Sequence, residues 1–284
     1  MNDHVPDIME KLPCGSLIQH GPYNNRIYLL KVGNNATEKL PLDLIELAKR
    51  HGYSKVFVKV PEKYSKNFTN AGYIKEASIP GFYRGNDKGI FMGYYLNCMR
   101  SSETDTAKME EILRLARSKS GTMVLPLVAD QFLIRPGKKK DIFKMANIYR
   151  NVFTTYPFPI YDSSYLWDTM QRNTSYYVVE VKGGDLVALS SAEIDASAQN
   201  AEMTDFAILS RWRQNNLSLH LLLRMEKEIK QKDINTVYTI ARAMSPGMNI
   251  TFSKLGYIYG GRLKNNTNIS ARIESMNVWY KTIS

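Results

Sequence analysis

The sequence has too few cysteines and histidines for a disulfide framework or a zinc site. Its 284 residues include two cysteines, Cys14 and Cys98, and four histidines without the spacing of metal ligands. No apolar run approaches the ~18 residues that span a bilayer. The N-terminal segment 1–11 carries acids and no apolar core, so it does not have the pattern of a signal peptide. These absences predict a cytoplasmic protein with free thiols and no bound metal.

Acidic residues are outnumbered by basic ones. The chain has 38 lysines and arginines against 27 acids, a formal net charge of +11. A basic surface attracts anions, and nucleic acid is the first candidate. The basic residues are scattered, however, and the one tight run, Lys138 to Lys140, follows a turn-like Arg135-Pro136-Gly137. A solvated loop explains this run more simply, so we do not expect a nucleic-acid partner.

The composition, with 44% hydrophobic and 23% charged residues, is that of a globular chain. We expect two lobes. Residues 1–100 alternate strand and helix patterns, which predicts an α/β lobe with a mainly parallel sheet. Residues 101–130 contain one amphipathic helix and form a connector. The elements expected in the first lobe are strands at 27–32, 55–60 and 90–96 and helices at 42–51 and 62–71, each helix ending at a glycine.

Residues 131–284 predict a second lobe with a mixed sheet flanked by helices. The order is strand, two helices, three antiparallel strands, helix, strand, helix, strand. A hairpin turn is expected at Lys182-Gly183-Gly184-Asp185. The expected elements are 132–136, 139–153, 164–172, 176–181, 186–194, 201–209, 217–231, 236–242, 248–254 and 276–281.

The block 202–228 contains a strand, a turn and the start of a helix. The order of elements and this turn resemble the GCN5-related N-acetyltransferase (GNAT) superfamily, which has Arg-x-x-Gly-x-Gly/Ala here. Glycines let the backbone approach a pyrophosphate, and N–H groups at the helix start bind its oxygens. Arg213 matches the motif, Asn216 replaces the first glycine, and Ser218 stands at the second small position. Because asparagine tolerates left-handed backbone, a phosphate cradle is still expected.

A second block, 245–257, resembles the family pattern at Lys254, Gly256 and Tyr257. Ser245 replaces an asparagine and Phe252 replaces a tyrosine that often serves as general acid. Phenylalanine cannot donate a proton, so the acid must be another group or a water. The resemblance implies acetyl-CoA as cosubstrate, whose phosphates would suit a basic protein. The binding residues that it implies are Phe206, Ala207, Ile208, Arg213, Gln214, Asn215, Asn216, Leu217, Ser218, Ser245 and Phe252.

Six further segments resemble one subfamily, the β-lysine N-acetyltransferases of methanogenic archaea and some bacteria. They are TIARAMSPGMNITFSKLGYIYGG, NNTNIS and ESMNVWYK in the second lobe and HGYSKVFVKVP, AGYIKEASIPGFYRG and FMGYYL in the first. The implied reaction is acetyl transfer to the side-chain amine of β-lysine, giving the compatible solute Nε-acetyl-β-lysine. The first lobe also mirrors the tail of the second. It is therefore either a degenerate acetyltransferase half, shaping the active site or a homodimer, or an unrelated α/β cap.

Amine acetylation needs a base, because an ammonium group has no lone pair, and a donor that polarises the thioester carbonyl. Glu202, six residues before Ile208, is the first candidate for the base, as in histone-type members, and Asp205 is the second. Strand alternation puts them on opposite faces, so only one is expected to face the cleft. A solvated acid at a strand end is the alternative for each. The amide of Phe206 or Ile208 would be the donor.

The two ends of the substrate are assigned by residue type. Glu193 or Glu274 would hold the second ammonium group, and Arg242 the carboxylate. Three other functions stay open. A protein- or peptide-lysine acetyltransferase would need an acidic groove, a catalytically impaired acyl-CoA-binding protein is favoured by Asn216 and Phe252, and a nucleic-acid binder is suggested by charge alone.

Overall fold

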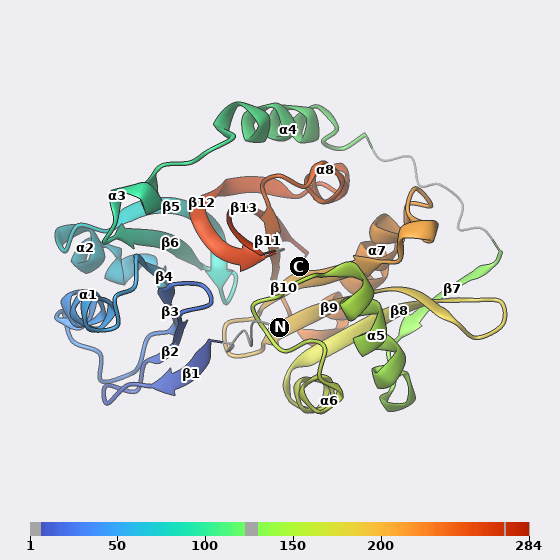
Figure 1. Cartoon of the computed structure of the whole chain (residues 1–284), viewed down its shortest axis with the longest axis horizontal. Coiled ribbons are helices and arrows are strands. Elements are labelled where there is room, and N and C mark those ends of the chain that lie inside the picture. Colours follow the sequence, from blue (N-terminus) through green and yellow to red (C-terminus); the bar gives the residue numbers. More distant parts are fainter. Residues whose placement is uncertain (1–6, 123–129, 270, 284) are drawn as a thin grey trace.

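The computed structural model describes residues 7–122, 130–269 and 271–283. Over these ranges two lobes share one 13-stranded sheet, in the order β1-β2-β3-β4-β6-β5-β12-β13-β11-β10-β9-β8-β7. The first lobe is blue to cyan in Figure 1, and the second runs from green to red. The lobes join where β5 (Ile74–Tyr83) pairs with β12 (Ile258–Ile269) at Ala77 and Gly261.

Most of the described helices and strands lie close to the positions that the sequence predicts, but β1, β2, α3 and β12 were not predicted. The first lobe and connector contain β1 (Ile8–Lys11), β2 (Leu17–Gly21), β3 (Arg26–Lys31), α1 (Leu40–Arg50), β4 (Lys55–Pro61), α2 (Glu62–Asn70), β5, β6 (Asp87–Tyr95), α3 (Cys98–Ser101) and α4 (Thr106–Ser118). The second lobe contains β7 (Phe132–Pro136), α5 (Ile142–Val152), α6 (Ser163–Arg172), β8 (Thr174–Val181), β9 (Leu186–Asp195), β10 (Asn200–Ile208), α7 (Leu217–Ile229), β11 (Thr236–Arg242), α8 (Pro246–Lys254), β12 and β13 (Arg272–Thr282).

The mainly parallel sheet expected for the first lobe is wrong. Among its described strand pairs only β3 and β4 run parallel, joined by the crossover helix α1. The pairs β1–β2, β2–β3, β4–β6 and β5–β6 are antiparallel. The short runs of β1 and β2 gave no strand pattern that we recognised, and the strand after α2 enters the sheet beyond β6 instead of beside β4. An α/β alternation in sequence therefore does not set the direction of pairing.

The two lobes repeat one topology. The order β1-β2-β3-α1-β4-α2-β5-β6 corresponds to β8-β9-β10-α7-β11-α8-β12-β13, and the strand order is palindromic about the β5–β12 contact. In both lobes a single parallel pair, β3–β4 or β10–β11, is flanked by antiparallel ones. The second lobe adds β7, α5 and α6. This repetition fits the interpretation of the first lobe as a degenerate acetyltransferase half.

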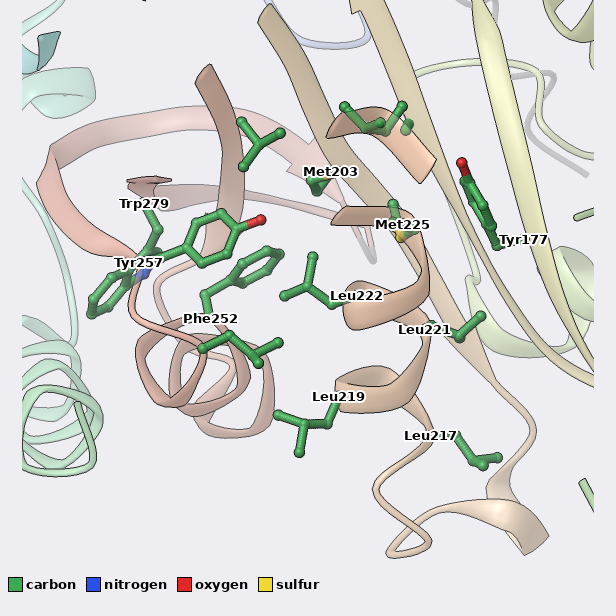
Figure 2. Packing of buried hydrophobic residues seen from close by; sticks show 14 of the residues in the cluster. Tyr177, Met203, Leu217, Leu219, Leu221, Leu222, Met225, Phe252, Tyr257 and Trp279 are labelled. Atoms are coloured by element: carbon green, nitrogen blue, oxygen red, sulfur yellow. The ribbon is translucent and has the colours of Figure 1, made fainter. Parts of the chain in front are cut away.

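Helices cover both faces of the second lobe's sheet. Leu222 and Met225 of α7 pack with Phe252 of α8 against one face, together with Met203 of β10, as Figure 2 shows. Helices α5 and α6 cover the opposite face, where Tyr149 is fully buried. The central strands are thus held between two apolar layers.

The first lobe is covered on one face by its own helices and on the other by the second lobe. Val56 and Val58 of β4 pack beneath α1 and α2. On the other face Phe57 and Phe91 form an aromatic cluster with Tyr238 of β11. This shared core fixes β3 and β4 beside the ends of β10 and β11.

The connector is partly described. Helix α4 packs on α8, above it in Figure 1, through Leu113 and Ala116; residues 123–129 lie outside the described ranges. Cys14 and Cys98 are free cysteines, as predicted. Across the described ranges no helix is long and apolar enough to cross a membrane.

A buried ion pair lies at the junction of the lobes. The Lys55 Nζ atom is 2.9 Å from the Glu76 carboxylate, and both side chains are almost fully buried. Lys55 also donates to the carbonyl of Lys264 in β12, at 2.7 Å, and the Lys264 amide donates to Glu76, at 2.8 Å. The backbones are so close here that a Cβ on Gly261, whose φ is +140°, would lie 2.2 Å from the Glu76 carbonyl oxygen.

Glu76→Gln should therefore destabilise the protein strongly. Removing one partner leaves the Lys55 charge buried without compensation, which typically costs about 3–5 kcal/mol. The free energy of unfolding in urea measures the effect. The double variant Lys55→Met/Glu76→Leu should cost less than Glu76→Gln, because no charge is then buried. An equal or larger loss in the double variant would contradict this account of the junction.

Candidate active site

The site begins where two parallel strands separate. β10 and β11 pair at only three positions, the last being Glu202 opposite Tyr238. Both strands then continue, β10 to Ile208 and β11 to Arg242. A cavity of about 1100 Å³ opens between them and is lined by residues of both lobes. The backbone edge of β10 beyond Glu202 is thus not used for pairing with β11.

A bulge in β10 brings the two predicted acids to the same cavity. The register with β9 shifts between Thr204 and Ala207, and Asp205 has a left-handed φ of +55°. Its carboxylate accepts hydrogen bonds from Ser191, at 2.6 Å, and from Tyr156. Both Asp205 and Glu202 line the cavity. The expectation that only one acid can face the cleft is wrong, because a bulge adds a residue and breaks the alternation of a regular strand.

Three carboxylates therefore share one site, Asp205 being buried and Glu193 and Glu202 half-buried. Glu193 of β9 lies directly opposite Glu202 in the antiparallel register, with Asp205 nearby. Burial, together with the charges of Glu202 and Asp205, raises the pKa of Glu193 to about 8. Burial also raises the pKa of Glu202, but Lys59 and Tyr238 oppose the shift. With a pKa of about 8, Glu193 is largely protonated near neutral pH.

The first lobe contributes a cation that the sequence analysis missed. Lys59 of β4 donates to the Tyr238 hydroxyl at 3.2 Å, and its ammonium lies 5.5 Å from the centre of the Phe82 ring. Burial acts to lower the pKa of Lys59, yet Tyr28 and Glu202 raise it on balance. The signal was present in the alternation of KVFVKV, which puts Lys59 on the same strand face as Phe57. A lysine among core positions marks a functional candidate.

Similar proteins identify the chain. No family model matches it. It is 38% identical over 266 residues to a β-lysine N(6)-acetyltransferase of Methanococcus maripaludis, covering 94% of this chain and 96% of the relative. The chain belongs to the β-lysine N(6)-acetyltransferase family. This confirms the predicted family and identifies the protein as an N-acetyltransferase with a mixed α/β fold.

Other members of the family align over similar lengths. The β-lysine N(6)-acetyltransferase of Methanosarcina mazei is 30% identical, covering 87% of this chain and 97% of its own. The N-acetyltransferase YodP of Bacillus subtilis is 31% identical, covering 94% and 96%. Among solved structures, a spermidine N-acetyltransferase of Vibrio cholerae covers 55% of this chain and 96% of its own at 18% identity, with a TM-score of 0.48.

The turn before α7 has the backbone that the family motif requires. Asn216 adopts a left-handed conformation, with φ +54° and ψ +23°, immediately before the first helical residue, Leu217. Its side chain makes no capping hydrogen bond. Asparagine thus takes over the conformational role of the glycine, as the sequence suggested. A β-branched residue could not do so without strain.

The predicted cofactor residues divide into three groups. Those that line the cavity are Phe206, Ile208, Arg213, Ser218, Ser245 and Phe252. Gln214, Asn215 and Asn216 form the exposed turn. The side chains of Ala207 and Leu217 are buried in the core, so these two residues can offer only backbone groups.

Phe252 provides no proton donor at the position of the family's tyrosine. It is 1% exposed and packs edge-on against Phe206 and Tyr257, with ring centres 5.7 and 5.0 Å apart. Tyr257 is also buried and does not line the cavity. The neighbouring tyrosine therefore does not replace the missing hydroxyl.

Of the residues assigned to the substrate ends, Glu193 and Arg242 line the cavity and Glu274 does not. The Glu274 carboxylate accepts from Arg242 Nε and Nη2, at 2.7 and 2.6 Å, and from Arg272 at 2.8 Å. Its assignment as an ammonium ligand is corrected, because its charge is already matched by two guanidinium groups. Arg242 is held in turn by its ion pair with Glu274.

Glu193→Gln should stabilise the protein at alkaline pH. An acid whose pKa is raised by folding binds more protons in the native than in the unfolded state between the two values, here from about 4.5 to about 8. Stability is therefore lost as pH rises through this window, and a neutral glutamine removes the loss. We expect a higher Tm than wild type at about pH 8.5, by ~2–4 °C for each kcal/mol recovered.

At about pH 5 the gain from Glu193→Gln should nearly vanish, because the native carboxyl is then protonated. Glu46→Gln, at an exposed position of α1, is the matched control and should shift Tm equally at both pH values. A gain for Glu193→Gln that does not depend on pH would show that Glu193 ionises normally.

Proposed function

We propose that this protein transfers the acetyl group of acetyl-CoA to the side-chain amine of β-lysine, in the cytoplasm, forming the compatible solute Nε-acetyl-β-lysine. The observation that carries the proposal is the cluster of Glu193, Glu202 and Asp205 at the opening between β10 and β11. Carboxylates partly withdrawn from water suit a cationic amine and can accept its proton. The names of two relatives support the choice of amine.

The residues around the start of α7 fit acetyl-CoA, which would supply the acetyl group as a thioester. The left-handed Asn216 lets the first amides of α7 point out of the helix start, where they can bind phosphate oxygens. Arg213 and Ser218 line the adjoining cavity and supply a cation and a hydroxyl. Phe206 and Ile208 lie on the stretch of β10 beyond its pairing with β11, where an amide could polarise the carbonyl.

Glu202 acts as the base in this scheme. It removes a proton from the substrate ammonium, and the neutral amine then forms the C–N bond as the C–S bond breaks. The attacking nitrogen loses its second proton, and the departing thiolate takes up one proton to become the thiol. Lys59 and Tyr238 beside Glu202 favour its ionised form, while Glu193 holds a proton. The proton donor for the thiolate is assigned to no side chain, because Phe252 cannot serve.

A catalytically impaired acyl-CoA-binding protein is the second candidate. Phe252 favours it, since the hydroxyl of the family's tyrosine is missing. Asn216, the other argument for impairment, no longer supports it, because it keeps the required left-handed backbone. Turnover separates the two functions: both predict binding of acetyl-CoA, and only the first predicts release of coenzyme A when β-lysine is added.

Glu202→Gln should lower kcat by ~100- to 10,000-fold near neutral pH, the usual contribution of a positioned base. The affinity for acetyl-CoA should stay nearly unchanged. The loss should shrink toward the amine pKa of ~10.4, where the substrate needs no base. Release of coenzyme A measured across this pH range tests both points.

Glu193→Gln and Asp205→Asn are the matched variants for the base, since both acids line the same cavity. Each should retain more activity than Glu202→Gln. If either variant loses kcat strongly while Glu202→Gln keeps the wild-type kcat, the base is misassigned.

Arg213→Ala should weaken acetyl-CoA binding by about tenfold, which corresponds to ~1.4 kcal/mol, while Asn216→Gly should leave it unchanged or tighten it. Asn216→Val should weaken it, because a β-branched residue resists a φ of +54°. Thermal shifts report the differences, since acetyl-CoA at 100 times its Kd adds ~2.7 kcal/mol. Loss of binding in Asn216→Gly would mean that the asparagine side chain itself contacts the cofactor.

A further inference from the structure

One wall of the cavity is made by residues that the proposed chemistry does not use. Arg26 of β3 and Asn266 of β12 both line it, and they are only 4% and 1% exposed. The Arg26 Nη1 atom donates to the main-chain oxygen of Asn266 and, at 3.3 Å, to the Thr267 hydroxyl. The two residues are therefore direct neighbours.

Arg26 is a buried cation. Within the described ranges no acidic side chain forms an ion pair with it, although the charges of Asp7 and Glu76 act on it from further away, and its Nε atom has no hydrogen-bond acceptor. Burial lowers the pKa of Arg26 to about 10, so the group stays charged at neutral pH. Buried charges in proteins are normally paired, because removing them from water costs several kcal/mol. The cavity beside Arg26 is thus suited to an anion.

Asn266 adds an unused acceptor at the same place. Its side-chain oxygen is buried without a hydrogen-bond donor among the described residues. The adjacent Asn265, in contrast, uses its amide to bind the carbonyls of Arg100 and Ser102, at 3.0 and 2.8 Å. Pairing of β12 with β13 shifts in this stretch, and Asn265 has a φ of +40°. This irregular segment places the Asn266 side chain at the cavity.

This wall is separated from the carboxylate cluster by two side chains. The Tyr28 ring centre lies 5.3 Å from the Arg26 guanidinium carbon and 6.0 Å from the Lys59 ammonium. Lys59 in turn donates to Tyr238, the register partner of Glu202. A ligand reaching from Arg26 to Glu202 would therefore pass along Tyr28 and Lys59.

We propose that Arg26 and Asn266 form the subsite for the amino-acid end of the substrate. Arg26 binds the carboxylate, and the Asn266 oxygen accepts a hydrogen bond from the ammonium group two carbons away, as in a β-amino acid. The remote amine then reaches Glu202. This inference rests on the proposed function and deepens it, and it assigns the carboxylate to Arg26 instead of Arg242, which is already bound to Glu274.

The test compares three amines by kcat/KM. β-Lysine has both groups, β-lysine amide lacks the carboxylate charge, and 6-aminohexanoate lacks only the 3-amino group. For the wild-type enzyme, removal of either group from the substrate should lower kcat/KM by about 10- to 150-fold, which is the range expected for a hydrogen bond to a charged group. Arg26→Gln should lower kcat/KM for β-lysine to the value for its amide, and it should leave kcat/KM for the amide unchanged. Asn266→Ala should lower kcat/KM for β-lysine to the value for 6-aminohexanoate.

Three results would overturn the subsite: equal use of β-lysine and its amide by the wild type, discrimination that persists in Arg26→Gln, or a variant that loses activity on all three amines alike. If Arg26→Gln does not fold, Asn266→Ala and the wild-type comparison still decide. If the wild type acetylates none of the amines, the proposed function fails, and calorimetric binding of β-lysine and its amide to the wild type decides on the subsite.

Discussion

The active site depends on the early end of pairing between β10 and β11. Three paired positions hold the strands together, and the bulge at Asp205 then turns β10 away. Continued pairing would use the backbone edge of β10 in a ladder and would fill the cavity with sheet. A regular strand would also turn Asp205 away from Glu202. The same irregularity therefore creates the space, the free edge and the grouping of the acids.

The first lobe contributes residues to the candidate site as well as to the fold. Its sheet continues that of the second lobe, and the junction is fixed by the Lys55–Glu76 pair and by aromatic rings around Phe57. This places Lys59 beside Glu202, in surroundings apolar enough to shift the pKa of the carboxyl groups. Without this lobe Glu202 would lose the Lys59 charge that favours its ionised form. The first lobe thus sets part of the electrostatic environment of these acids.

Local patterns predicted most of the elements, because most strands and helices have a clear period and a glycine or a charged turn at their ends. The Arg213–Ser218 turn could be placed from its motif and its helix start. The direction of the Asp205 side chain could not be predicted from the sequence, because the bulge depends on how β9 and β10 pair. Arg26 was missed for a related reason: it reaches the cavity through a contact between lobes that are far apart in sequence. Lys59 could have been found from the alternation of its own strand.

The charges inside the cavity argue for a small zwitterionic substrate more strongly than the net charge does. The whole chain is basic, which would suit the phosphates of the proposed cosubstrate, whereas the cavity carries the three acids of β9 and β10. Arg26 and Lys59 lie on the first lobe's side of the same cavity. A peptide lysine would bring its ammonium without a nearby carboxylate. A diamino acid matches both signs of charge at once.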